Sequence, residues 1–215
     1  MNKLIVAEKP SVAARIAMAL CDSNPKTESM NGVRYFMASV GKDQVFVVSA
    51  VGHLFTLSQK GQNKLPVFDI DWVASYKISK GAYFTKKYLD VIETVGRKCA
   101  FFINACDYDI EGTVIGTNIL KHVANGNVNS ELEDGNFRRM QFSTTTDADL
   151  RESYAKMGGF DRLNFDAGEA RHRLDWMWGI NMKLDMVDCA ASPNIMPRNP
   201  ALTNIPPRYW YPKIM

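Results

Sequence analysis

Three acidic residues lie close together near the middle of the chain, at Asp107, Asp109 and Glu111, and Gly112 follows them. They come directly after Cys99–Cys106, a nearly continuous apolar run typical of a central parallel strand. If that strand continues through Asp109, the side chains of Asp107 and Asp109 project to the same side, and Glu111 joins them from the following turn. Clustered carboxylates favour a bound cation, and oxygen ligands at an open site suit Mg²⁺. The pattern therefore predicts a magnesium site, although a solvated acidic turn at a helix N-terminus would show the same residues.

Another pair of charged residues, Glu8 and Lys9, comes at the end of Leu4–Glu8, which is expected to be the first strand. If this strand neighbours Cys99–Cys106, both sets of charges lie at the carboxyl edge of the sheet, where open α/β sheets bind ligands. There Glu8 could transfer a proton and Lys9 could hold a phosphate. A salt-bridged pair on the surface is the alternative for these two residues.

The segment Gly52-His53-Leu54 ends another expected strand and contains one of the three histidines. A role for His53 at the same site is one hypothesis. A packed or hydrogen-bonded structural histidine is the more frequent case for a single imidazole.

A fourth candidate group lies in Glu169–Trp176, within an expected helix. Arg171 and Asp175 are four residues apart, so they share a face of that helix. Arg171, His172 and Arg173 could contact a DNA backbone. The alternative is an amphipathic helix that carries a surface ion pair and packs its tryptophans in a core.

The elements that must position these residues alternate between strands and helices, which predicts an α/β fold with a mostly parallel central sheet. The expected strands are Leu4–Glu8, Tyr35–Val40, Gln44–Val51, Cys99–Cys106 and Phe137–Phe142. The expected helices are Val12–Leu20, Tyr83–Lys98, Thr113–Val123, Thr145–Met157 (opened by Thr146 or Asp147) and Asp166–Val187, with a break near Gly179 as an alternative. Asp22–Gly32, Ser58–Trp72 and Asn125–Asn136 are expected to lack regular structure.

Composition narrows the class of protein without identifying it. The chain has 215 residues, of which 46% are hydrophobic and 23% charged, with a net charge of +3 and a pI near 8.6. No apolar stretch is long enough for a membrane span or a secretory signal. The cysteines show no CxxC spacing, which disfavours a zinc ribbon and favours free thiols in a reducing cytoplasm.

Taken together, five segments resemble type IA DNA topoisomerases, and most closely the archaeal and topoisomerase III branch. They match in the right order from about residue 3 to residue 182, and five motifs in register are far more specific than any one of them. The segments are Leu4–Ser11, Gly52–Leu54, Asp107–Gly112, Arg139–Ser143 and Ala167–Asn181. Many members have an arginine within the acidic motif and a glutamate after Gly112, whereas this chain has Ile110 and Thr113, as archaeal-like members do.

The resemblance implies a Toprim (Rossmann-like) domain at about residues 1–157 and the start of a helical domain at 158–188. Residues 189–215 form a Pro-rich tail, for which an extended arm and a disordered segment are the two alternatives. The resemblance also implies ATP-independent cleavage and religation of a single-stranded DNA segment, in which a tyrosine attacks the phosphodiester and keeps the 5′ phosphate. The expected setting is the cytoplasm, close to the nucleoid, with no membrane association.

The roles implied for individual residues follow from the same resemblance. Asp107, Asp109 and Glu111 would bind Mg²⁺, and Glu8 would act as general acid and base at the leaving 3′ oxygen. Lys9 and Arg171 would stabilise charge on the scissile phosphate, which is a large contribution in such catalysis. His53 and Asp175 would support the site. DNA would be bound by Arg171, His172 and Arg173.

The nucleophilic tyrosine of such enzymes is expected to lie beyond the last residue of this chain. Tyr209 and Tyr211 are in the Pro-rich tail, which does not resemble the tyrosine motif. The chain is therefore expected to be incomplete by itself, and to depend on a downstream region or a separate chain. A free-standing Mg²⁺-dependent Toprim nuclease and a non-catalytic DNA-binding module are the alternatives.

Overall fold

The computed structural model describes residues 1–61, 66–124 and 135–191, with side chains described as far as residue 182. The strands are β1 Asn2–Ala7, β2 Lys26–Met30, β3 Val33–Val40, β4 Asp43–Ser49, β5 Phe55–Gln59, β6 Ile70–Ala74, β7 Phe101–Ala105 and β8 Phe137–Arg139. The helices are α1 Pro10–Leu20, α2 Ser75–Ile78, the 3₁₀ turn η1 Lys80–Ala82, α3 Thr85–Gly96, α4 Ile110–Val123, α6 Asp147–Ala155 and α7 Arg162–Ala191. The α/β class is as predicted.

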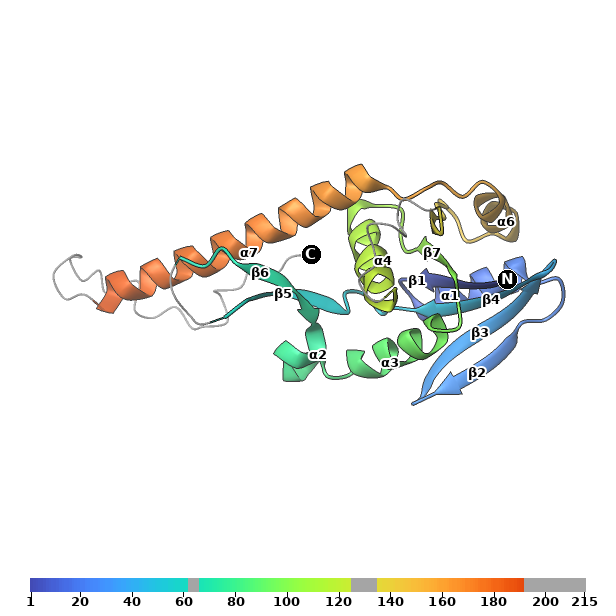
Figure 1. The fold of residues 1–215 in the computed structure, drawn as a ribbon, viewed down its shortest axis with the longest axis horizontal. Coiled ribbons are helices and arrows are strands. Elements are labelled where there is room, and N and C mark those ends of the chain that lie inside the picture. Colours follow the sequence, from blue (N-terminus) through green and yellow to red (C-terminus); the bar gives the residue numbers. More distant parts are fainter. Residues whose placement is uncertain (62–65, 125–134, 192–215) are drawn as a thin grey trace.

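Six strands form the central sheet, in the order β2-β3-β4-β1-β7-β8 (Figure 1). The strand β1 pairs in parallel with β4 on one side and with β7 on the other, and β7 pairs in parallel with β8. Only the β2–β3–β4 end is antiparallel. The predicted adjacency of the first strand and the Cys99–Cys106 strand is confirmed, and it brings their carboxyl ends to one edge.

Both faces of the sheet are covered, which explains the continuous apolar runs in β1 and β7. Along β1, Leu4 and Val6 pack on one side with α3 and α4, whereas Ile5 and Ala7 pack on the other with α1 and α6. These four side chains have no exposed surface. Fully burying a Leu, Ile or Val side chain stabilises a fold by roughly 1.5–3 kcal/mol, so the strands that carry the edge residues are rigidly held.

Helix starts follow the expected capping chemistry at two places. Thr146 accepts a hydrogen bond from the Asp149 N–H and caps α6, one of the two predicted openings. Pro10 occupies the first turn of α1, where its missing N–H is not needed.

Several boundaries differ from the sequence predictions. The predicted loop Asp22–Gly32 contains β2, whose polar side chains give no strand signal and whose place is set by backbone pairing with β3. The predicted irregular segment Ser58–Trp72 overlaps β5 and β6, which pair as an antiparallel two-stranded sheet. The helix predicted for Asp166–Val187 begins at Arg162 and continues through Gly179 without a break. Residues 189–191 of the expected Pro-rich tail belong to α7. The rest of that tail, from residue 192, and most of the predicted loop Asn125–Asn136 lie outside the described residues.

Beyond the sheet, α7 extends away from the α/β body, and the β5–β6 hairpin runs beside it (Figure 1). A small apolar cluster joins the two: Leu57, Val67 and Ile70 pack with Trp72, Trp176, Met177 and Ile180. Asn181 fastens the contact, because its amide accepts from the Val67 N–H at 2.8 Å and donates to the Val67 carbonyl at 3.0 Å. We call the β5–β6 hairpin and the part of α7 beside it the arm.

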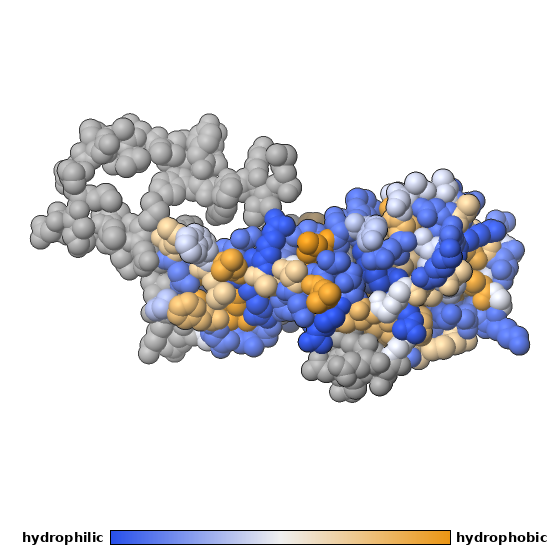
Figure 2. Space-filling view, turned by 90° about the horizontal axis from the view of Figure 1, so that it is seen from above, coloured by the Kyte–Doolittle hydropathy of each residue, from blue (hydrophilic) through white to orange (hydrophobic). Residues whose placement is uncertain are grey.

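The outer side of α7 carries apolar side chains among charged ones, visible as orange spheres along its length in Figure 2. The large exposed apolar residues of this helix are Leu163, Leu174, Trp178 and Met182. Within the described ranges, none of the helices combines the length and the apolar character that crossing a membrane requires.

Candidate active site at the carboxyl edge of the sheet

The carboxyl ends of β4, β1 and β7 lie side by side and present the predicted site residues. Backbone bonds continue the β1–β4 pairing past the strands, because Ala50 and Val51 donate to the carbonyls of Ala7 and Glu8 at 2.9 and 2.8 Å. Val51 (φ 56°) and Gly52 (φ 88°) then reverse the chain. A positive φ is strained for a β-branched residue such as Val51, and this turn sets the position of His53.

Glu8, Asp107 and Asp109 form what we call the acidic cluster. The side chain of Glu8 is partly buried, and this burial together with the negative charge of Asp107 raises its pKa above the ordinary value. Lys9 and Asp109 act on the same carboxyl in opposite directions. Glu8 is therefore close enough to Asp107 and Asp109 for electrostatic repulsion between the carboxylates, as predicted from the adjacency of the strands.

Lys9 balances part of this negative charge. Its Nζ lies 2.6 Å from Asp107 Oδ2, and the hydrogen bond and charge of Asp107 raise the lysine pKa. The lysine side chain is 56% exposed, so its ammonium group faces solvent at the edge. In place of the alternative, an ion pair between Glu8 and Lys9, the structure has a pair between the segments that follow β1 and β7.

Asp109 does not extend the strand, as one sequence interpretation required. β7 ends at Ala105, and Asp109 is the N-cap of α4, where its Oδ1 accepts from the Gly112 N–H at 2.6 Å. The correction has a simple cause, because an Asp side chain at this position satisfies a helix N–H that would otherwise lack a partner. Asp109 therefore caps α4 and also belongs to the acidic cluster.

Two residues that the sequence interpretation left out of the site fix the backbone between β7 and α4. Arg139 is 3% exposed, and its guanidinium donates to the carbonyls of Cys106 at 2.9 Å and Asp107 at 2.7 Å. Burial lowers the pKa of Arg139. Asn104, also buried, donates to the Gly112 carbonyl and accepts from the Cys106 N–H. A charged residue within the expected strand Phe137–Phe142 was the signal that could have found Arg139.

Gly112 allows this close packing. A Cβ at this position would lie 2.1 Å from the Asp107 carbonyl oxygen and 2.9 Å from its nitrogen, which are backbone atoms that cannot move aside. The first turn of α4 therefore packs directly on the segment that carries Asp107, and only glycine permits it.

Glu111 contacts residues of α7 and the segment after β4. Its Oε2 lies 2.8 Å from His172 Nε2 and 3.2 Å from His53 Nε2. Burial alone would raise the Glu111 pKa, but the hydrogen bonds and charges of His172 and His53 outweigh it and lower the pKa. Burial and the neighbouring His172 lower the pKa of His53. We call His53, Glu111 and His172 the histidine cluster.

Arg171 also reaches this cluster from α7. Its Nη1 lies 3.6 Å from Glu111 Oε1, and its Nε lies 3.8 Å from Asp175 Oδ2, the pair expected from their spacing. Arg173 faces a different direction, since it pairs with Glu169 at 2.9 Å and donates to the Ile70 carbonyl at 3.0 Å. The structure thus brings Arg171 and His172 to the edge, whereas Arg173 joins α7 to the β5–β6 hairpin.

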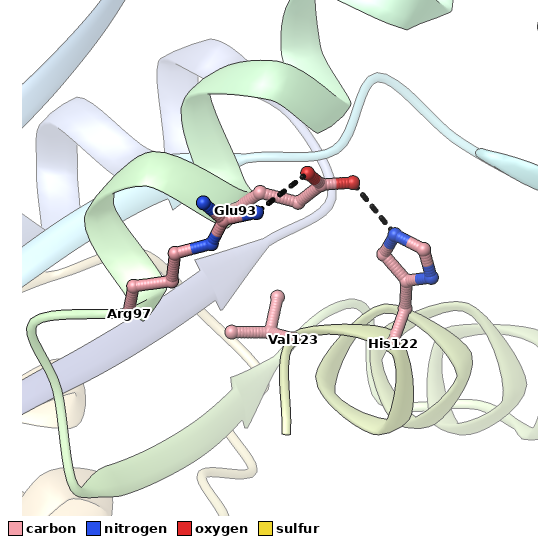
Figure 3. A pocket seen from close by; sticks show the side chains of 4 residues that line it. All are labelled: Glu93, Arg97, His122 and Val123. Carbon is pink, nitrogen blue, oxygen red and sulfur yellow. Dashed lines mark hydrogen bonds and ion pairs between the residues drawn. The ribbon is translucent and has the colours of Figure 1, made fainter. Parts of the chain in front are cut away.

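A shallow cavity of about 190 Å³ lies elsewhere, at the ends of α3 and α4 (Figure 3). Glu93 lies there between His122, at 2.6 Å, and Arg97, at 3.7 Å. His122 is in the last turn of α4 and Glu111 in the first, so a rise of 1.5 Å per residue separates them by roughly 16 Å. This cavity is therefore not part of the carboxyl edge.

Comparison with known proteins shows the family of this chain. Residues 3–145 match the family described as Toprim domain. The chain belongs to the Toprim domain family. Toprim domains bind divalent metal ions, and the donor set of this chain fits one, since the acidic cluster and Glu111 supply carboxylate oxygens at an exposed edge.

The similarity to complete proteins extends past the Toprim domain. The chain is 38% identical over 183 residues to DNA topoisomerase 1 of Pyrococcus furiosus, covering 83% of this chain and 16% of the relative. It is 36% identical over 197 residues to DNA topoisomerase 1 of Methanocaldococcus jannaschii, covering 90% and 24%. The chain thus spans between about a sixth and a quarter of the length of these relatives.

Among solved structures, the chain is similar to full-length topoisomerase I from Thermotoga maritima. The TM-score is 0.48 and the identity 21%, and the match covers 80% of this chain and 24% of the other.

Proposed function

We propose that this chain is the metal- and DNA-binding portion of a type IA DNA topoisomerase, acting on a single-stranded DNA segment. The observation that carries the proposal is the edge itself: Glu8, Lys9 and Asp107 follow the adjacent parallel strands β1 and β7, and Arg171 of α7 reaches Glu111 in the first turn of α4. The relatives named DNA topoisomerase 1 add support over most of the chain. The attacking tyrosine would come from a downstream region or a separate chain. The proposed setting is the cytoplasm, at the nucleoid.

Two cations are suited to a DNA phosphate at this edge. Lys9 and Arg171 are 56% and 61% exposed, and each is now paired with a carboxylate. A phosphate that entered between them would exchange one anionic partner for another, with charge-assisted hydrogen bonds in both states. His172 and Arg173 of the same helix are the further DNA-binding residues of this proposal, and Arg173 would exchange its pairing with Glu169 for a phosphate.

Glu8 is suited to transfer a proton to the 3′ oxygen that leaves and returns. Its raised pKa increases the protonated fraction near neutral pH, which a general acid requires. His53 and Asp175 have supporting roles in this proposal, because each contacts a charged site residue, Glu111 and Arg171 respectively.

For Mg²⁺ we propose Asp107, Asp109 and Glu111 as the carboxylate ligands, with Glu111 turned towards the histidines in the described conformation. When bound, the ion would neutralise charge on the phosphate oxygens. The residues of the chain would do the rest: Lys9 and Arg171 would orient the phosphate, and Glu8 would hold the proton.

The test uses the purified chain with negatively supercoiled plasmid and with a labelled single-stranded oligonucleotide, each with and without Mg²⁺. An Asp107→Ala, Asp109→Ala double variant is compared with a matched Asp90→Ala, Glu152→Ala variant, which removes two exposed charges paired within α3 and α6. We expect unchanged plasmid in every lane, and single-strand binding that Mg²⁺ strengthens except in the Asp107/Asp109 variant.

Other outcomes would identify the alternatives. Stepwise topoisomers would mean that this chain carries its own nucleophile, so its proposed incompleteness would be wrong. Nicked circles that need Mg²⁺ and vanish in the Asp107/Asp109 variant would favour a hydrolase. Binding that ignores Mg²⁺ and falls steeply with salt would favour a non-catalytic DNA-binding module.

A further inference from the structure

The histidine cluster brings together three side chains that are distant in the sequence. His53 follows β4, Glu111 lies in the first turn of α4, and His172 lies on α7. Both imidazole Nε2 atoms face the same carboxylate oxygen, at 3.2 and 2.8 Å. One ligand atom from each residue lies within 4.8 Å of the other two. Asp107 and Asp109 do not belong to this group of residues.

The chemistry of this set differs from that of the acidic cluster. Two imidazole nitrogens and one carboxylate oxygen are ligands that Zn²⁺, Co²⁺ and similar transition ions prefer, whereas Mg²⁺ prefers oxygen ligands alone. An ion at about 2.0–2.2 Å from each ligand atom separates those atoms by roughly 3–3.5 Å. The two distances from the histidines to Glu111 are close to that spacing and the two histidine ligand atoms lie within 4.8 Å of each other, so side-chain shifts would admit an ion.

The surroundings hold the ligands in place and leave the site open. The ring of His172 packs edge-on against His53 and Trp72, with centroids 5.3 and 5.5 Å apart. The strained turn at Val51 and Gly52 sets the position of His53. The three side chains are 30–36% exposed, which leaves room for a water or phosphate ligand.

The guanidinium of Arg171 opposes a cation, since it lies 3.6 Å from the other oxygen of Glu111. The same side chain is mostly exposed and already contacts Asp175 through Nε. Arg171 can therefore turn fully towards Asp175 when an ion enters. The positive charge of the ion then neutralises Glu111 in place of the guanidinium.

We propose that His53, Glu111 and His172 form a divalent transition-metal site, which shares only Glu111 with the proposed Mg²⁺ site and fastens α7 to the Toprim domain. An ion there ties the helix that carries Arg171 to α4 and to the end of β4. It holds in place the part of α7 that carries Arg171, and it needs neither Asp107 nor Asp109 as a ligand.

The test titrates the untagged, chelator-treated chain with Co²⁺ and follows its visible absorption, which reports ligand type and geometry. Zn²⁺ is added in a parallel thermal unfolding experiment. We expect one Co²⁺ per chain, and about tenfold or greater loss of affinity in both His53→Ala and His172→Ala. The matched control is His122→Ala, the third histidine, which pairs with Glu93 at the far end of α4. Zn²⁺ is expected to raise the unfolding midpoint of the unmodified chain and of His122→Ala only.

An Asp107→Asn, Asp109→Asn variant separates this proposal from the proposed function. It is expected to lose the Mg²⁺ effect on DNA binding and to keep Co²⁺ binding. Unchanged Co²⁺ affinity in folded His53→Ala and His172→Ala chains would overturn the metal site. Intense thiolate-to-cobalt absorption in the near ultraviolet would also overturn it, by assigning the ion to cysteine. Circular dichroism of each variant confirms that it is folded.

Discussion

The acidic cluster and the histidine cluster meet at one sheet edge, and Asp109 and Glu111 are only two residues apart, yet the two clusters are built differently. The acidic cluster is attached to buried parallel strands, and its backbone is fixed by Arg139, Asn104 and the contact at Gly112. The histidine cluster joins a strand end to two helices and exists only while α7 is packed on α4. The first turn of α4 thus separates the edge into two halves. The half with the acidic cluster is rigid, and the half with the histidine cluster depends on the packing of α7 on α4.

The difference suggests separate tasks. The rigid half is suited to hold an ion and a reacting phosphate, which require fixed geometry. The half that depends on docking is suited to couple the position of α7, and with it Arg171, to the rest of the edge. Substitutions at α4 and α7 should therefore affect the two halves unequally.

The largest effect is expected for Gly112→Ala. The added Cβ would overlap the Asp107 backbone at 2.1 Å, so the segment between β7 and α4 must shift. We expect the free energy of unfolding to fall by about 3 kcal/mol, measured by urea denaturation, together with loss of Mg²⁺ binding. The matched control is Gly179→Ala, an exposed position of α7 where the Cβ meets nothing within 4 Å. A Gly112→Ala chain as stable as that control would contradict the rigid packing.

The sheet-borne half was largely predictable from sequence, because its geometry follows from local rules. Continuous apolar runs identify parallel buried strands, and parallel strands place their carboxyl ends together, so Glu8, Lys9 and Asp107 could be assigned to one edge. The capping role of Asp109 was one of two interpretations of the sequence, because the same residues are compatible with a continued strand and with the start of a helix.

The other half could not be predicted in this way. Nothing in the local pattern of Glu111 indicates that it faces His53 and His172, because that contact depends on how α7 crosses α4. The same reason applies to β5 and β6, whose mixed sequence becomes a hairpin only beside α7, and to β2, which forms by pairing with β3. Arg139 was missed because its partners are carbonyl oxygens, which no sequence pattern specifies, so its charge within an expected strand was the one available signal.

A smaller effect is expected where the two helices cross, at Gly168. A Cβ there would approach Val114 Cγ2 at 2.5 Å and Ile110 Cγ2 at 2.8 Å, which are side-chain ends that can adjust. Gly168→Ala should lower the free energy of unfolding by about 1–2 kcal/mol, partly offset by better helix propensity. We expect it to weaken Co²⁺ binding at the histidine cluster and to leave Mg²⁺ binding unchanged. Equal loss at both clusters would show that they are not separate units.

Next in size is the fastening of the arm by Asn181. Asn181→Ala removes two hydrogen bonds to the backbone of Val67, which is 7% exposed, and should cost about 1 kcal/mol. Amide hydrogen exchange is expected to become faster in β5 and β6 and to stay unchanged in β1 and β7. Faster exchange throughout the central sheet would contradict the view that the arm is a separate unit of stability.

The smallest effects, and the sharpest comparison, are expected from the two glutamates, whose pKa values shift in opposite directions. The folded-state pKa of Glu8 is raised from 4.5, so stability falls as the pH rises through that pKa. Glu8→Gln removes this loss and should be slightly more stable than the unmodified chain near neutral pH. The pKa of Glu111 is lowered, so its stabilising contribution is present above its ordinary value of 4.5 and is lost as the pH falls through the folded-state pKa.

Glu111→Gln should therefore be less stable near neutral pH, with the difference shrinking towards acid. Urea denaturation of both variants across about pH 3–8, with chelator present, measures the two slopes. Changes of the same sign in Glu8→Gln and Glu111→Gln would mean that one shared electrostatic environment covers the edge. Opposite signs are expected because burial among like charges dominates at Glu8, whereas the histidines dominate at Glu111.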